Sequence, residues 1–137
     1  MGKHIKTLGL AIFCAIFFNS CATYHLSTQS LLTQFAKTQK ETKINTFVAF
    51  PFYYTGVVTG NNLREIKCQD KKGIEHTIRL TNHTGVRITK KDGNRNTFYF
   101  DTLLIQDSTI NGAKSHFLGL SINPILLNDI DKIEIQK

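Results

Sequence analysis

The fold class follows from the stretch LREIKCQDKKGIEHTIRLT, residues 63–81. Two segments with apolar residues at alternate positions, 63–69 and 74–81, flank the four residues Asp70-Lys71-Lys72-Gly73. This pattern predicts a β-hairpin in which Gly73 takes the positive φ that the turn requires. The same alternation predicts one buried face on the two strands, made of Ile66, Cys68, Ile74, His76, Ile78 and Leu80.

A second hairpin pattern follows, with residues 86–90 and 97–106 joined through Lys91-Asp92-Gly93-Asn94. Shorter strand-like segments occupy 108–110, 117–122 and 132–136. No segment between these strands has the periodicity of a crossover helix, so we expect the strands to be antiparallel. The sequence therefore predicts a mainly β protein with one N-terminal helix (α+β), whose strands, about six or seven in number, form an antiparallel meander or a small, partly open β-barrel.

The predicted helix runs from Ser27, a suitable N-cap residue, to about Thr38. Its apolar residues fall on one stripe, formed by Leu31, Leu32, Phe35 and Ala36. The favoured interpretation is that this stripe packs on the sheet. The alternative is that it lies against a membrane, with anionic headgroups near Lys37, Lys40 and Lys43.

The densest aromatic segment lies between residues 46 and 54 and contains Phe47, Phe50, Phe52, Tyr53 and Tyr54. Its composition predicts a strand with an edge or a bend at Pro51, followed by a turn bracketed by Gly56 and residues 60–62. The favoured interpretation assigns these aromatic side chains to the core and to the cover of a sheet edge. The alternative is an exposed platform for a sugar or a peptide.

The composition is that of one small folded domain with a basic surface. The chain has 137 residues, of which 41% are hydrophobic and 20% are charged. These values exclude a disordered tail and a large enzyme scaffold. The formal net charge of +7 is spread along the chain, so nucleic acid is not expected as a partner.

The first twenty residues have the organisation of an export signal. Lys3 and Lys6 precede an uninterrupted run without charge, residues 8–18. As a helix, this run would cover about 16 Å, which is about half of a hydrocarbon core. We therefore expect a signal peptide rather than a membrane-spanning helix.

The signal ends in Phe18-Asn19-Ser20-Cys21, which resembles the lipobox of bacterial lipoproteins. The resemblance implies cleavage before Cys21 and attachment of lipid chains, such as palmitate, to Cys21. It also implies three parts: a signal peptide (1–20), a lipidated tether (21–26) and a single globular domain (27–137). Because Ala22 is not an acidic retention residue, the resemblance implies the periplasmic face of the outer membrane. The alternative is an ordinary secretory signal with an incidental cysteine.

The end of the chain, residues 125–135, resembles the close of small Sm-like barrels, in which a short helical turn precedes the last strand. This resemblance concerns shape only. The glycine placements of the nucleic-acid-binding members are not matched, so no RNA partner is expected.

Candidate chemistry is sparse. We expect no metal and no cofactor, because none of the mature histidines has a metal-ligand spacing (His25, His76, His83 and His116). Cys14 leaves with the signal and Cys21 carries lipid, so Cys68 has no cysteine partner for a disulfide. The favoured interpretation of Cys68 is a buried, inert thiol. The alternative is a catalytic pair with His76 across the first hairpin.

The sequence favours a membrane-anchored, non-enzymatic lipoprotein that binds or scaffolds an envelope partner. One alternative is a small periplasmic hydrolase that uses Cys68 and His76 or polar residues that no motif identifies. Another is an electrostatic binder of an anionic envelope polymer or of lipid headgroups. The latter would use a charge of +5, because removal of Lys3 and Lys6 with no acidic residue lowers the formal +7 by two.

Overall fold

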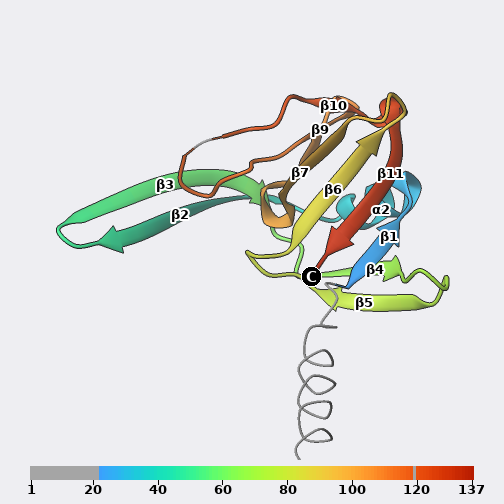
Figure 1. Cartoon of the computed structure of the whole chain (residues 1–137), viewed down its shortest axis with the longest axis horizontal. Coiled ribbons are helices and arrows are strands. Elements are labelled where there is room, and N and C mark those ends of the chain that lie inside the picture. The colour runs from blue at the N-terminus through green and yellow to red at the C-terminus, as the bar shows by residue number, and fades with distance from the viewer. Residues whose placement is uncertain (1–21, 119) are drawn as a thin grey trace, which may run out of the picture.

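The computed structural model describes residues 22–118 and 120–137. Within these residues the chain is mainly β, with a single α-helix (Figure 1). The elements are, in order, β1 (Thr23–Leu26), α2 (Thr28–Phe35), β2 (Lys40–Ala49), β3 (Phe52–Asn61), β4 (Glu65–Gln69), β5 (Glu75–Arg79), β6 (Gly85–Lys90), β7 (Arg95–Tyr99), η1 (Phe100–Thr102), β8 (Leu104–Gln106), β9 (Thr109–Asn111), β10 (Ile125–Leu126), η2 (Leu127–Asp129) and β11 (Ile130–Gln136).

The main sheet has six strands in the order β5-β4-β1-β11-β6-β7, and every neighbouring pair is antiparallel. Strands from the two ends of the described chain therefore lie side by side at the centre of this sheet. The expected tether at 21–26 is wrong for its larger part, because Thr23–Leu26 forms β1 and pairs with both β11 and β4. Interior strands on both sides satisfy its backbone groups, which a flexible tether would leave to water.

The two predicted hairpins are confirmed, except that the strand expected at 97–106 ends at Tyr99 and residues 104–106 form β8 in another sheet. β4 pairs with β5, and β6 pairs with β7. Gly73 and Gly93 occupy the turns with φ of 80° and 83°, a conformation that residues with a Cβ rarely adopt.

The helix is confirmed within a few residues. It begins after Ser27, whose side-chain oxygen accepts a 3.1 Å hydrogen bond from the backbone N–H of Ser30. Leu31 and Phe35 of the predicted stripe are buried in the core, whereas Leu32 is half-buried and Ala36 is exposed, so the core interpretation is confirmed for two of its four residues. The core also contains inward side chains of the main sheet, of the small sheet described next and of the segments that connect them: Leu26, Ile66, Cys68, Ile78, Val86, Ile88, Phe98, Phe100, Leu103, Ile110, Ile122, Ile125, Ile130, Ile133 and Ile135.

A second, three-stranded antiparallel sheet has the order β10-β9-β8. The strand expected at 117–122 is wrong: in the described part of this segment only an isolated bridge from Ser121 to Ala113 is formed. The short turn η2 does precede the last strand, as in the Sm-like barrels. The sheets are nevertheless open, and none closes into a barrel.

β2 and β3 form a separate two-stranded sheet, the β2–β3 arm (residues 40–61), which projects from the body (Figure 1). Pro51 lies in its turn, so the predicted bend is confirmed. The turn expected around Gly56 and residues 60–62 is wrong, since Gly56, Gly60 and Asn61 are part of β3. Gly56 and Gly60 instead allow the backbone of β3 to approach the backbone of the body closely.

Candidate functional site

The β2–β3 arm is the most unusual surface of the described chain. Eight of its large apolar side chains are exposed, and Phe50 at the tip is 97% exposed. Soluble proteins usually bury large apolar side chains or expose them singly, so a group of this size on one hairpin is uncommon. The eight are Ile44, Phe47, Val48, Phe50, Phe52, Tyr53, Tyr54 and Val57.

The register of the arm separates these side chains into two faces. Directly opposite residues of an antiparallel pair project on the same side of the ribbon. The outer face therefore contains four cross-strand pairs, and all of these residues are exposed: Thr42 with Thr59, Ile44 with Val57, Thr46 with Thr55, and Val48 with Tyr53. The inner face contains Glu41, Lys43, Asn45 and Phe47 of β2 together with Tyr54, Gly56, Val58 and Gly60 of β3.

The arm carries no charge over most of its length. Residues 44–63 contain no Asp, Glu, Lys or Arg, so the charged side chains of the arm lie only at its base. Exposed edge strands are usually protected from self-pairing by charged residues. Here both strands are ten residues long, and each pairs on one side only within the described residues. The arm therefore presents apolar faces and free backbone edges together.

Asn61 attaches the base of the arm to the body. Its side chain is 2% exposed, and its Nδ2 atom donates hydrogen bonds of 2.9 Å to the carbonyl oxygens of Phe100 and Leu103. Its Oδ1 atom accepts a 3.0 Å bond from the backbone N–H of Leu63. One buried amide thus fixes where β3 ends and how it meets η1.

Glycine allows the inner face to approach the body closely. A Cβ on Gly60 would lie 1.8 Å from the carbonyl oxygen of Asp101, and a Cβ on Gly56 would lie 2.6 Å from that of His116. No larger residue fits between these backbones. Phe47 then meets Phe117 with ring centroids 6.0 Å apart. The inner face is therefore packed on the body from Gly60 as far as Phe47, whereas the outer face and the tip are exposed.

A polar cluster lies beneath the inner face. Asp101 Oδ1 is 2.9 Å from His116 Nε2, and Asp101 Oδ2 is 3.6 Å from Lys43 Nζ. The His116 ring also stacks on Tyr99 at a centroid distance of 4.2 Å. These contacts join β2, η1 and the segment around His116. Because the carboxylate and the ring are both engaged within the cluster, we interpret it as structural.

The structure brings Cys68 and His76 directly opposite each other on β4 and β5. Their side chains do not form a nucleophile–base pair. Cys68 Sγ donates a long contact of 3.7 Å to the backbone oxygen of His76, whereas the His76 ring lies 3.1 Å from Asp70 Oδ2 and packs edge-on against Tyr24. The imidazole is thus held by a carboxylate rather than by the thiol.

Electrostatics agree with this geometry. Burial raises the pKa of the Cys68 thiol to about 11, so the thiolate is rare at neutral pH. The backbone N–H of Ile74, followed by the His76 ring, lowers the pKa of Asp70 below its usual value. Asp70 and His76 therefore stabilise the turn of the first hairpin, and Cys68 is not an activated nucleophile.

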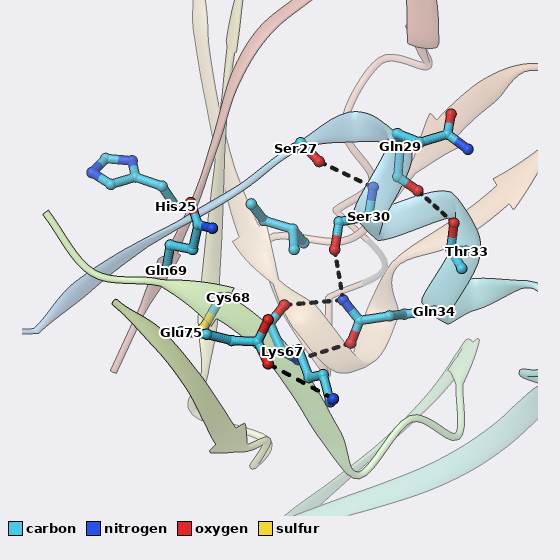
Figure 2. A pocket seen from close by; sticks show the side chains of 11 residues that line it. His25, Ser27, Gln29, Ser30, Thr33, Gln34, Lys67, Cys68, Gln69 and Glu75 are labelled. Atoms are coloured by element: carbon cyan, nitrogen blue, oxygen red, sulfur yellow. Dashed lines mark hydrogen bonds and ion pairs between the residues drawn. The ribbon is translucent and has the colours of Figure 1, made fainter. Parts of the chain in front are cut away.

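A polar hollow of about 510 Å³ lies between α2 and β4 (Figure 2). Gln34 closes one side of it: its Nε2 atom donates to the Lys67 carbonyl at 3.0 Å, and its Oε1 atom accepts from the Lys67 N–H at 2.8 Å. An ion pair of 3.7 Å joins Lys67 and Glu75 on another side. Gln34, Lys67 and Glu75 thus bind one another, and the hollow is a polar depression without a cluster of convergent apolar side chains.

Neither a metal centre nor a membrane-spanning helix is found in the described residues. No group of three or more His, Cys, Asp or Glu side chains in them is arranged to hold a metal ion. No helix among them has the length and hydrophobicity needed to cross a membrane. Cys21, the predicted lipid attachment site, lies outside the residues that the structure describes.

Comparison with known proteins adds no relative. No protein-family model, no curated protein and no solved structure matches this chain. A functional proposal therefore depends on the geometry of the arm and on the N-terminal sequence.

The arm also corrects the sequence interpretation. The aromatic residues of 46–54 were expected in the core or as edge cover, and the core interpretation is wrong because Phe50, Phe52 and Tyr53 are 97%, 64% and 76% exposed. The signal that identifies the arm is the absence of charge over residues 44–63. A second signal is the β-branched residues at alternate positions on both sides of Pro51, at 42–48 and at 55–59, which favour two strands joined at the proline.

Proposed function

We propose that this protein is a non-enzymatic binding module of the bacterial envelope that contacts its partner through the β2–β3 arm. The observation that supports this role is the exposure of eight large apolar side chains on one projecting hairpin. Their exposed fractions amount to about 1,000 Å² of side-chain surface over both faces and the tip, of which the outer face and the tip account for about 600 Å². The largest apolar patch of a typical monomer is about 300–600 Å². Burial of this surface against another molecule would be strongly favourable.

In this proposal, lipid on Cys21 holds the domain at the periplasmic face of the outer membrane. The lipobox-like sequence at 18–21 supports this attachment. Because β1 begins at Thr23, only Ala22 would separate the lipidated cysteine from the sheet. A single residue spans at most about 3.6 Å, so the body would lie directly on the headgroups.

The surface next to the start of the described chain is suited to that position. A hollow of about 300 Å³ is lined by Ala22, Thr23 and Tyr24 together with the turn residues Asp70, Lys71 and Lys72, and by His76. Lys71 and Lys72 are exposed, and each Lys near an anionic membrane surface contributes about 1 kcal/mol. The electrostatic alternative is thus retained as a contribution to membrane contact.

The hydrolase alternative has less support. Cys68 is 3% exposed, its thiol has a pKa of about 11, and the His76 ring binds Asp70. A hydrolase would need an accessible thiolate beside a free base.

Two measurements test the proposal in cells that produce the full chain. The mass of the N-terminal peptide should correspond to a Cys21 that carries fatty acyl chains, and a water-soluble chain with an unmodified sulfur would contradict the anchor. A photoreactive amino acid at Tyr53 should form covalent adducts, whereas the same group at Asn128, exposed on η2, should not. Equal labelling by water-borne reagents at both positions, without adducts, would contradict the binding role of the arm.

A further inference from the structure

We propose that the occupant of the β2–β3 arm is the arm of a second copy of this chain, so that the outer faces of two arms pack on each other about a twofold axis. This inference rests on the proposed role of the arm and names its partner. A twofold contact uses the same patch on both copies, so a single self-complementary face is sufficient.

The area of the arm fits such a dimer. A standard interface buries about 800 Å² on each partner. The outer face and the tip expose about 600 Å² of apolar side chain, from Ile44, Val48, Phe50, Tyr53 and Val57, and the exposed threonines of the same face add to this area. Two copies that pack their arms together would therefore reach the size of a specific interface without help from the rest of the body.

The distribution of charge favours a second copy over an acidic partner. Without Lys3 and Lys6 of the expected signal the chain has a formal charge of +5, so the bodies of two copies repel each other. Residues 44–63 carry no charged side chain, so two copies can meet there without bringing like charges together. An acidic partner would instead be attracted to the lysines on the body.

The outer face has the regularity that packing of two β-ribbons requires. Its four cross-strand pairs consist of Thr, Ile, Val and Tyr, and apolar pairs alternate with threonine pairs along the ribbon. Seven of these eight side chains are β-branched, which gives a stiff and level surface. Sheets with such faces pack about 10 Å apart. Phe50, at the end of the ribbon, would then reach along the partner arm.

Insertion of the arm into lipid is less favourable than self-association. Both edges of the ribbon have unpaired backbone groups within the described chain, and hydrocarbon cannot satisfy them. In Figure 1 the arm leaves the body to the left, whereas the start of β1 and the C-terminus lie at the lower edge. An arm that extends sideways from the anchored edge would meet the arms of neighbouring copies on the same membrane. Tethering to one surface also raises the effective concentration of those copies.

Cysteine crosslinking in native membranes tests the inference. The full chain is produced as two copies with different tags, each with Val48→Cys on the outer face, and is treated with a short bis-maleimide. The matched control is Asn128→Cys, which is exposed on η2. Cys68 is buried with a raised thiol pKa, so it contributes little background. Thr46→Cys, on the same face, guards against a local effect of one substitution.

The inference predicts a covalent dimer containing both tags for Val48→Cys and Thr46→Cys, with a yield at least tenfold above that of Asn128→Cys. A product that contains one copy and a different protein would overturn the second-copy inference but retain the binding role of the arm. Labelling of position 48 by a lipid-soluble photoprobe, without a dimer, would overturn it in favour of lipid. Free access of water-borne maleimide to position 48, with no product, would overturn both proposals.

Discussion

Asn61 and Leu103 are joined by a buried hydrogen bond of 2.9 Å from the side-chain Nδ2 of the first to the backbone oxygen of the second. The same amide reaches the carbonyl of Phe100, so a single side chain connects the end of β3 to the turn that leads from β7 to β8. Through this connection the position of the arm depends on residues about forty positions away in the chain.

Replacement of Asn61 by alanine should lower the free energy of unfolding by about 2–3 kcal/mol, because the carbonyl oxygens of Phe100 and Leu103 lose the buried amide donor and the Leu63 N–H loses its acceptor. Urea unfolding measures this change. Asn62→Ala is the matched control: Asn62 is exposed and accepts one bond from the backbone of Gln39, so its loss should amount to less than about 1 kcal/mol. Equal effects of the two variants would contradict the role of Asn61.

Gly60→Ala should destabilise the contact between the arm and the body by about 3 kcal/mol, since the added Cβ would lie 1.8 Å from the Asp101 carbonyl oxygen. Hydrogen exchange of β3 amides should accelerate in this variant. Gly85→Ala serves as the control, because the nearest atom to its Cβ is a flexible Gln136 side-chain atom at 3.5 Å. A Gly60→Ala protein with the protection pattern of the wild type would refute the close approach.

Acid should weaken the fold partly through Glu134. Lys132 Nζ lies 2.8 Å from Glu134 Oε1 and Arg87 lies 3.8 Å from Oε2, and the hydrogen bond to Lys132 lowers the pKa of Glu134. A carboxyl whose pKa is lower in the folded state contributes stability above its unfolded pKa. That contribution is lost as the pH falls below about 4.3 toward the folded value.

The urea midpoint of the wild type should therefore decrease between pH 6 and pH 3.5 more than that of Glu134→Gln. Glu65→Gln provides the comparison, since Glu65 is exposed and has no ion pair in the described residues. Identical pH dependences of the urea midpoint for the wild type and Glu134→Gln would show that Glu134 does not contribute to the acid sensitivity of the fold.

Cys68 should react slowly with thiol reagents in the native protein. A pKa of about 11 reduces the thiolate at neutral pH at least ~100-fold relative to an ordinary cysteine, and burial restricts access further. Urea should restore an ordinary rate. Cys68→Ala should leave the cellular role intact, and a variant that folds normally but loses that role would revive the hydrolase alternative.

Val48→Lys combined with Tyr53→Lys should abolish binding by the arm, because the two residues are directly opposite and would place two ammonium groups on its outer face. We expect at least a tenfold loss of arm crosslinks. The stability of the domain should change by less than about 0.5 kcal/mol, since both side chains are exposed. Asn128→Lys adds a charge on the body and should have no effect on the crosslinks.

Most local elements of the body could be predicted from the sequence. The alternation around Ile66 and Ile78, the turns with Gly73 and Gly93, and the N-cap Ser27 were all recognised correctly. These features depend on neighbours within a few residues along the chain, where turn geometry and side-chain periodicity are decisive. The candidate lipid site Cys21 comes from the same kind of local pattern and stays a prediction.

The arm could be predicted only in part. The bend at Pro51 was recognised, but Gly56 and Gly60 were read as turn residues because an isolated glycine in a strand does not reveal what lies across from it. The aromatic side chains near Phe50 were assigned to the core because hydrophobicity alone favours burial.

By itself, the order of residues determined the two hairpins with turns at Gly73 and Gly93, the helix start and the charge-free segment 44–63, since each is a property of adjacent residues. Only the tertiary structure decided that β1 lies between β4 and β11 and that the arm projects with its outer face uncovered. Those outcomes depend on which distant segments pack against a given face, and local periodicity contains no information about the partner across it.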